Sequence, residues 1–200
     1  MDEPRKRRSK TDSLAKSRLA AIALAAVPAA GAAQAPPDKP LYVGRLDPFR
    51  EKTLEQRIQE LTDREEIRDL IATYAHRVAH GLSIADLFTD DGVYINRHNG
   101  AVSEARGRAA LEARFHDRPG DDGSAMPMIH NILISIDGDQ ATDICSNELR
   151  ITENGKSIIA SGYYDDQLRR EHGRWKFVKR DITFFHWVPL QEGWAKPAGK

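Results

Sequence analysis

The sequence predicts an α+β fold in which helices come first and a curved antiparallel sheet follows. Two patterns carry this prediction: apolar residues recur at helical spacing between residues 54 and 81, and strand-like segments follow after residue 125. The length supports it, because 200 residues suffice for one ordinary domain with its own core. Long strands must twist, so we expect the sheet to curl around the helices.

Two helices are predicted at the start of the domain. The first is short and has three apolar residues at helical spacing: Leu54, Ile58 and Leu61. Thr62 and Glu65 then form a capping-box pattern, which predicts that the main helix begins there. The main helix carries one apolar stripe: Ile67, Leu70, Ile71, Tyr74 and Val78. Gly81 is expected to end this helix.

Shorter elements are expected between the main helix and the long strands. Ile84–Phe88 predicts a short helical turn, and Asp90–Gly92 predicts a chain turn before a short strand over Val93–Asn96. Gly107–Phe115 then predicts a third helix.

The C-terminal half predicts a four-stranded antiparallel meander. Turn dipeptides separate the strands: Asp137-Gly138, Asn154-Gly155 and His172-Gly173. The predicted strands are Met126–Ile136, Ala141–Thr152, Ser157–Arg170 and Arg174–Trp187. Helices followed by such a meander are typical of the α+β class.

His130 lies in the middle of an otherwise apolar strand face. It shares this face with five Met and Ile side chains, because side chains alternate along a strand. Depending on the turn length, His130 pairs with Cys145 or with Asn147, and both registers keep the same inner face. That face then also carries Tyr164 and Asp166. A β-bulge would change this alternation.

The first 35 residues have the layout of an export signal. A basic start precedes a short apolar run, and small residues that end at Ala33 or Ala35 follow it. The apolar run is too short to span a bilayer, and the alternatives are a basic tail or an Ala-rich helix. We therefore expect a periplasmic or secreted protein. The expected division is a signal over 1–35, an extended lead-in over 36–53, the domain over 54–190 and a C-terminal tail over 191–200.

The charge and cysteine content narrow the class of partner. The whole chain has 30 basic and 30 acidic residues, but residues 1–35 carry an excess of four positive charges, so the remainder is acidic. This balance argues against a nucleic-acid partner, which requires a basic surface. The single cysteine, Cys145, cannot form an internal disulfide, so an exported domain must rely on its core. No membrane segment is expected after the signal.

Several short motifs occur in a recognisable order. They are Tyr74-Ala75-His76, Leu87–Tyr94, Gly107-Arg108, the His130 strand with its Asp137–Asp139 turn, Gly162–Asp166 and Gly173–Trp175. Together they resemble the SnoaL-like branch of the NTF2-like superfamily over about residues 54–190. The resemblance implies a cone-shaped α+β barrel with an apolar pocket, often dimeric, and a cofactor-free lyase or isomerase of the dehydratase type. Other members are binding or accessory proteins.

The resemblance also implies a catalytic pair. In dehydratase-like members a histidine on this strand acts with an aspartate at the end of the main helix, and a tyrosine five residues earlier assists. His130 matches the histidine as general acid/base and Tyr74 matches the tyrosine, but Ala79 stands in the aspartate position. Hence two hypotheses remain: a catalyst that depends on His130, or a non-catalytic binding or accessory module that has lost its carboxylate.

The expected ligand is a hydrophobic, cyclic small molecule. Its contacts are expected from Asn147, Tyr164, Asp166, Tyr94 and Phe88; an inward Asp166 could instead pair with an arginine or the backbone. No metal or other cofactor is expected. Although two helix histidines, at positions 76 and 80, are four residues apart, the first lies opposite the apolar stripe and the sequence lacks the glutamate of a zinc protease.

Overall fold

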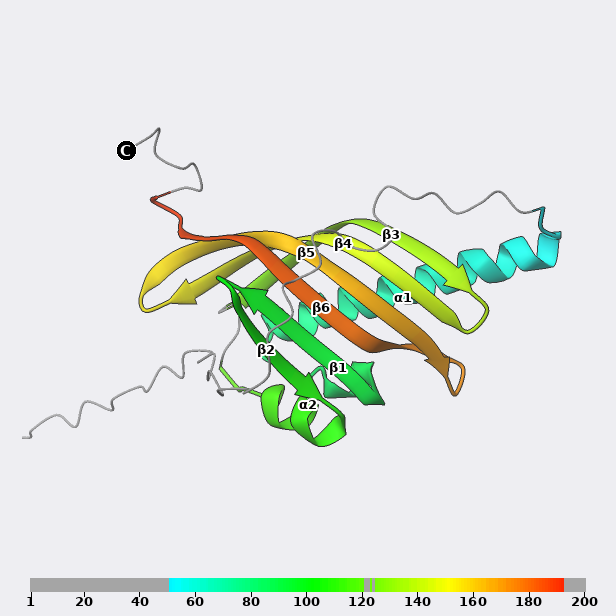
Figure 1. Cartoon of the computed structure of the whole chain (residues 1–200), viewed down its shortest axis with the longest axis horizontal. Helices are drawn as coiled ribbons and strands as arrows, with labels where there is room; N and C mark the ends of the chain where they lie inside the picture. The colour runs from blue at the N-terminus through cyan, green and yellow to red at the C-terminus, as the bar shows by residue number, and fades with distance from the viewer. Residues whose placement is uncertain (1–50, 121–122, 124, 193–200) are drawn as a thin grey trace, which may run out of the picture.

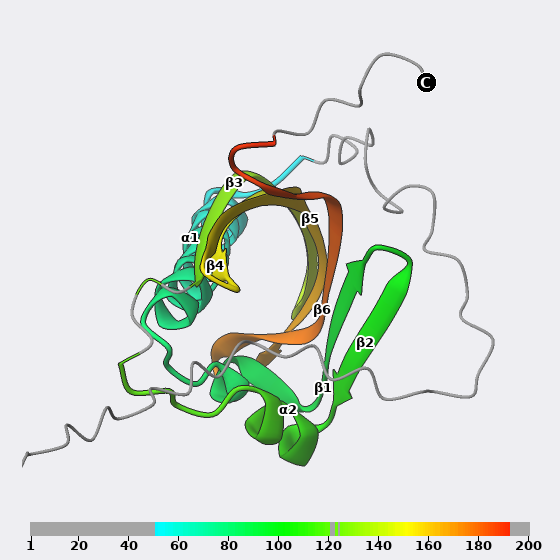
Figure 2. The ribbon, with the colours of Figure 1, turned by 90° about the vertical axis from the view of Figure 1, so that its left-hand side faces the viewer.

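The computed structural model describes residues 51–120, 123 and 125–192. One mixed sheet of six strands has the order β2-β1-β6-β5-β4-β3, and α1 lies along the edge strand β3 (Figures 1 and 2). The elements are α1 (Leu54–Ala79), η1 (Ala85–Leu87), β1 (Phe88–His98), β2 (Ala101–Arg106), α2 (Arg108–Arg114), β3 (Ala125–Asp137), β4 (Gln140–Glu153), β5 (Lys156–Glu171) and β6 (Arg174–Pro189). The predicted α+β class is confirmed. The predicted export signal and most of the lead-in lie outside the described residues.

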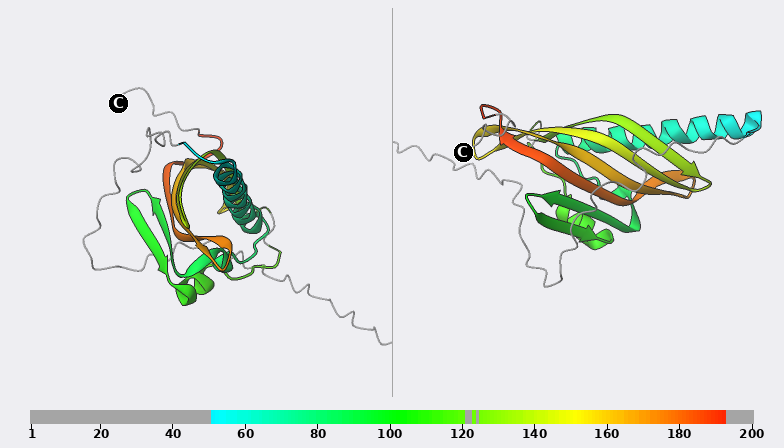
Figure 3. Two further views of the ribbon diagram at one scale, coloured as in Figure 1. Left: turned by 90° about the vertical axis from the view of Figure 1, so that its right-hand side faces the viewer. Right: turned by 45° about the horizontal axis from the view of Figure 1, so that its top comes forward.

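Helix α1 is one continuous helix and not the two that the sequence predicted. Thr53 caps its start, with a reciprocal capping box to Gln56. Thr62 does not cap a second helix, because its hydroxyl donates to the carbonyl of Ile58 one turn earlier (3.1 Å). Gly81 has a φ of 63° and follows the end of the helix, as predicted. The first turns of α1 extend past the strands (Figure 3).

The middle of the chain departs most from prediction. Asp90–Gly92 is not a free turn, because it lies inside β1, where the pairing with β6 shifts register between Phe88 and Val93. Strand β2 was not predicted and pairs with the end of β1. The predicted helical turn and third helix correspond to η1 and α2 and are confirmed. Since β1 runs parallel to β6, the sheet is mixed.

The predicted meander is confirmed over β3 to β6. The paired strands end within two residues of the predicted bounds, and Asn154 and His172 adopt the positive φ values that tight hairpin turns require. The chain also makes a close approach at Gly162, where the β5–β6 register shifts. A Cβ there would lie 1.9 Å from the carbonyl oxygen of Thr183, so only glycine fits without moving the backbone.

Strand β3 contains a bulge that reverses the predicted orientation of His130. Near the hairpin Leu133 pairs with Ile144, but beyond Asn131, whose φ is 53°, the register shifts by one residue and His130 pairs with Ser146. Because side chains alternate, the shift turns Ile129 inward and His130 outward. The prediction that His130 faces the core is therefore wrong: its side chain is exposed.

The core lies between α1 and the concave face of the sheet. Its largest fully buried side chains are Ile67, Ile71, Ile84, Phe88, Leu111, Tyr164, Phe177 and Ile182, together with four polar residues, Thr89, Asp143, Asp166 and Arg180. In the described part of the chain, no helix is long and apolar enough to span a membrane.

Candidate functional site

A row of charged side chains crosses the inner face of the sheet. The strand register places Asp143 of β4 beside Asp166 of β5, and Asp166 beside Arg180 of β6. The row continues to Tyr94 on β1. All three charged side chains are completely buried. Such residues are almost never fully buried unless they are paired, so this row is the main candidate site.

Aromatic rings surround the guanidinium of Arg180. Its Cζ atom lies 3.9 Å from the ring centroid of Tyr74 and 3.8 Å from that of Tyr164, with Phe177 at 4.5 Å. These are cation–π contacts in a buried environment, where they are strongest. Tyr74 comes from α1 and Tyr164 from β5, so the helix and the sheet hold the cation between them.

The two carboxyl groups share the positive charge of Arg180. Its Nη2 lies 3.5 Å from Oδ2 of Asp166, an ion pair without hydrogen-bond geometry. Burial raises the pKa of Asp143 to about 6, against the opposing effect of Arg180. Burial also raises the pKa of Asp166 well above its ordinary value. Two buried carboxyls facing one guanidinium therefore hold their protons to a higher pH than ordinary aspartates do, which suits them to acid–base chemistry.

Several polar atoms of this row have no hydrogen-bond partner among the described residues. They are both carboxylate oxygens of Asp143 and of Asp166 and the three side-chain nitrogens of Arg180. A buried polar atom without a partner costs about 1–3 kcal/mol, so the row has unused capacity to bind a polar group. A proton on one carboxyl can be shared between Asp143 and Asp166, so the unused capacity lies chiefly with the guanidinium of Arg180.

Two phenols lie beside the charged row. The hydroxyl of Tyr164 donates to the hydroxyl of Tyr74 over 3.4 Å, which leaves the proton of Tyr74 available to another acceptor. Burial raises the pKa of both phenols, so both are neutral. Phe88 is completely buried and packs on Phe177, with 5.4 Å between ring centroids.

The structure thus places the sequence-predicted site residues in two locations. The inner side of the sheet and α1 carries Tyr74, Phe88, Tyr94, Asn147, Tyr164 and Asp166. His130 lies on the outer side, for the reason given above. The sequence left open whether Asp166 contacts a ligand or pairs with an arginine or the backbone, and in the structure it pairs with Arg180.

Sequence reasoning missed Asp143 and Arg180. Asp143 could have been found, because it shares the parity of Cys145 and Asn147 on β4. Arg180 could not have been found from strand alternation. It is three residues from Phe177, a spacing that normally puts two side chains on opposite faces, but Val178 is an extra residue in the β5–β6 pairing and brings both to the inner face.

Asp143, Cys145 and Asp166 bring three possible metal-ligand atoms within 4.8 Å of one another. They do not suit a cation, because the guanidinium of Arg180 already provides positive charge beside Asp166. Burial also raises the pKa of the Cys145 thiol, which keeps it protonated and a poor ligand. We therefore assign no metal to this cluster.

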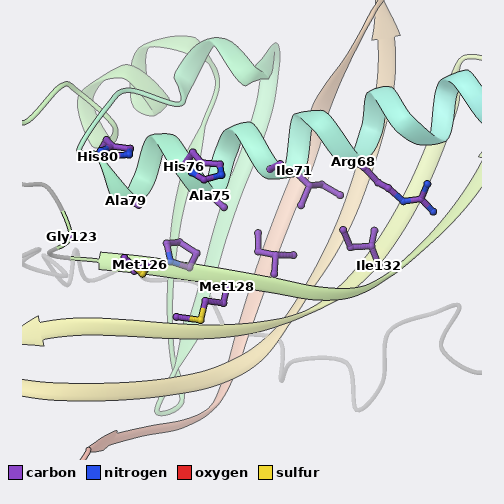
Figure 4. A pocket seen from close by; sticks show the side chains of 13 residues that line it. Arg68, Ile71, Ala75, His76, Ala79, His80, Gly123, Met126, Met128 and Ile132 are labelled. Atoms are coloured by element: carbon purple, nitrogen blue, oxygen red, sulfur yellow. The ribbon is translucent and has the colours of Figure 1, made fainter.

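An apolar pocket of about 450 Å³ lies between α1 and β3 (Figure 4). Its wall consists of Arg68, Ile71, Ala72, Ala75, His76, Ala79 and His80 of the helix side and Gly123, Met126, Pro127, Met128, Ile129 and Ile132 of the strand side. Ile71 belongs to the buried core that contains Tyr74 and Tyr164, and Ile129 and Ile132 pack against this core. The pocket therefore borders this core through Ile71, Ile129 and Ile132, while no residue of the charged row lines it, and its volume is that of a small-molecule site.

Comparisons with known proteins agree on the family. The sequence model of the SnoaL-like domain matches residues 59–181. The comparison with curated proteins gave no match.

Two solved structures illustrate the likeness. An NTF2-like protein with a cystatin-like fold from Novosphingobium aromaticivorans is 26% identical, with a TM-score of 0.53, over 66% of this chain and 88% of that one. The hexachlorocyclohexane dehydrochlorinase LinA-type3 from Novosphingobium barchaimii is 20% identical, with a TM-score of 0.56, over 71% of this chain and 99% of that one. The second likeness shows the fold alone. With its mixed curved sheet, its helix α1 and the matched domain, the chain belongs to the SnoaL-like family of NTF2-like proteins.

Proposed function

We propose that this protein is a cofactor-free lyase or isomerase of the dehydratase type that acts on a hydrophobic cyclic substrate. One observation carries the proposal: Arg180 is buried between two tyrosine rings, faces two carboxyl groups, and has no hydrogen-bond partner within the described residues. Charged groups arranged in this way stabilise negative charge that develops on a substrate oxygen.

The proposed elimination uses both carboxyl groups. The ionised carboxylate removes a proton from the carbon next to a substrate carbonyl, and Arg180 donates to the oxygen as it becomes an enolate. The enolate then expels a hydroxyl from the neighbouring carbon, and the protonated carboxyl gives its proton to this group, which leaves as water. The pair thereby regains its starting protonation. An isomerase would return the proton to another carbon.

The α1–β3 pocket supports the apolar part of the proposal. Nine of its lining residues are Ala, Ile, Met or Pro, so it suits the ring system of a hydrophobic ligand. The structural neighbour LinA-type3 is, by its name, a dehydrochlorinase of hexachlorocyclohexane, and an elimination on a cyclic apolar molecule is the class of reaction proposed here. His130 has no role in this proposal, because its side chain faces away from the charged row.

The test is turnover of cyclic β-hydroxyketones, followed by loss of water in the mass spectrum and by absorbance of the conjugated enone. Asp143→Asn, Asp166→Asn and Arg180→Lys should each lower kcat by about 10²–10⁴-fold. His130→Gln is the matched control and should retain the wild-type rate. If the control abolishes turnover and the three variants do not, the charged row is not the site.

The second candidate function, a binding or accessory module, is favoured by Ala79. This residue lines the pocket at the position where the family resemblance expects a carboxylate. A binding module would retain ligand without converting it, so native mass spectrometry together with the turnover assay separates the two functions.

We also propose that residues 1–35 act as an export signal, because their order of basic, apolar and small residues has that layout. Sequencing the N-terminus of protein recovered from the periplasm tests this: a processed chain should begin directly after Ala33 or Ala35, and an unprocessed chain would contradict it.

A further inference from the structure

A second group of polar side chains lies on the inner face, away from the charged row. Asn147 of β4 is 3% exposed, and neither its Oδ1 nor its Nδ2 has a partner among the described residues. The same holds for two buried atoms on β1, Oδ1 of Asn96 and Nε2 of His98. The proposed reaction uses none of these atoms.

The strand register places these residues around two aromatic rings. Asn147 pairs with Gly162, and Gly162 pairs with Phe184. The ring of His98 lies 6.2 Å from that of Phe184 and 4.5 Å from that of Trp187. Gly162 has no side chain, and the carbonyl oxygen of Thr183 lies where its Cβ would stand, so the backbone of β6 closely approaches β5 in this row.

The spacing between the two polar groups follows from the strands. Asn147 is four residues from Asp143 on β4, and Phe184 is four residues from Arg180 on β6. At about 3.3 Å per residue, the two groups are about 13 Å apart along the sheet. Cys145, Tyr164 and Ile182 lie between them on the same face and are buried.

The second group is neutral, in contrast to the charged row. Burial lowers the pKa of His98, so its imidazole is uncharged near neutral pH. The amide of Asn147 offers both a donor and an acceptor. The best partner for these atoms is a neutral hydroxyl or carbonyl on a ring that can stack against Trp187.

We infer that Asn96, His98 and Asn147 form a second subsite, which binds a neutral hydroxyl or carbonyl at the far end of an elongated, ring-containing ligand. The other end of this ligand lies at the Arg180 row, so the inference rests on the proposed function and specifies its substrate: two polar ends separated by an apolar body.

The experiment compares two probes that differ by one hydroxyl, 4,4′-dihydroxybiphenyl and 4-hydroxybiphenyl, by calorimetric titration of the full chain. The wild type should bind the diol about tenfold more tightly, the value of one additional hydrogen bond to a buried partner. Asn147→Leu and His98→Phe should remove this difference and leave binding of the mono-phenol unchanged. His116→Phe, at an exposed histidine, is the control and should preserve the tenfold difference.

Equal binding of the two probes by the wild type, or a tenfold difference that persists in both variants, would overturn the second subsite alone. Binding of neither probe would overturn the proposed hydrophobic ligand as well. Side-chain ¹H–¹⁵N spectra of the wild type give a measurement that needs no variant: the His98 imidazole signals should shift with the diol and not with the mono-phenol.

Discussion

Strands β3 and β4 are neighbours in one sheet, yet their faces are arranged differently. Every second residue of β4 from Ala141 to Leu149 is buried, without interruption. In β3 the regular alternation holds only between Ile132 and Asp137. On the N-terminal side of the bulge at Asn131, the residues that face inward and those that face outward are exchanged relative to that pattern. As a result the regular strand points Asp143 at Arg180, whereas the bulged strand points its histidine at solvent. A reactive residue type on an apolar strand therefore indicates a site only if the register is continuous.

The largest expected effect concerns the regular inner face. Arg180→Met removes the only cation of the charged row and leaves two buried carboxyl groups, so the free energy of unfolding should fall by about 3–5 kcal/mol. Urea denaturation measures this change. Arg174→Met, on the same strand but exposed, should change stability by less than about 0.5 kcal/mol. Equal effects of the two substitutions would contradict the buried pairing.

The second effect is a pH dependence that Asp143 provides. Its pKa rises from 3.8 to about 6 on folding, so between these values the folded state binds more protons than the unfolded state. Its contribution to stability is fully present below pH 3.8 and is lost as the pH rises through 6, by about 1.4 kcal/mol per unit of pKa shift. Denaturation measured between pH 4 and 7 should therefore show that the free energy of unfolding declines less with pH in Asp143→Asn than in the wild type. An unchanged slope would mean that the carboxyl titrates normally.

A smaller effect tests the bulge itself. Asn131 has a positive φ that asparagine and glycine tolerate and β-branched residues do not. Asn131→Val should therefore lower the free energy of unfolding by about 1–2 kcal/mol, whereas Asn131→Gly should change it by less than about 0.5 kcal/mol. Thermal and urea denaturation measure both. If valine is tolerated as well as glycine, the register in solution differs from the one described.

The smallest effect is expected at His130. Because this side chain is exposed, His130→Gln should change stability by less than about 0.5 kcal/mol and leave the Arg180 row intact. A loss of several kcal/mol would place the imidazole inside the domain after all.

These contrasts show what sequence patterns could predict. The meander was predictable because its strands alternate and glycine-containing dipeptides mark its turns, both of which are local signals. Two turns lie at the predicted pairs, Asn154-Gly155 and His172-Gly173, whereas the first lies at Gly138-Asp139, one residue beyond the predicted Asp137-Gly138. Strand β2 and the parallel pairing of β1 with β6 were not, because partners far apart in sequence stabilise them. The continuity of α1 past Thr62 was hidden because the capping pattern of Thr62 and Glu65 also fits within a helix.

The candidate site was predictable only in part. Tyr74 follows from the helical stripe, and Tyr164 and Asp166 follow from strand parity across a regular hairpin. Arg180 was assigned to no site because it lies near Val178, an extra residue in the β5–β6 pairing. His130 was assigned to the wrong side because it lies next to Asn131, the extra residue in β3. A bulge depends on how two strands fit together, so neither strand reveals it on its own.

The bulge lets β3 absorb a change of one residue in its length. A gene that lacked the single codon for Asn131 would encode a strand with continuous pairing, in which His130 still pairs with Ser146 and Ile129 still faces inward. Every remaining residue of the strand would keep its side without any compensating replacement. At this one position of β3 a deletion should therefore preserve the chemistry of the interior.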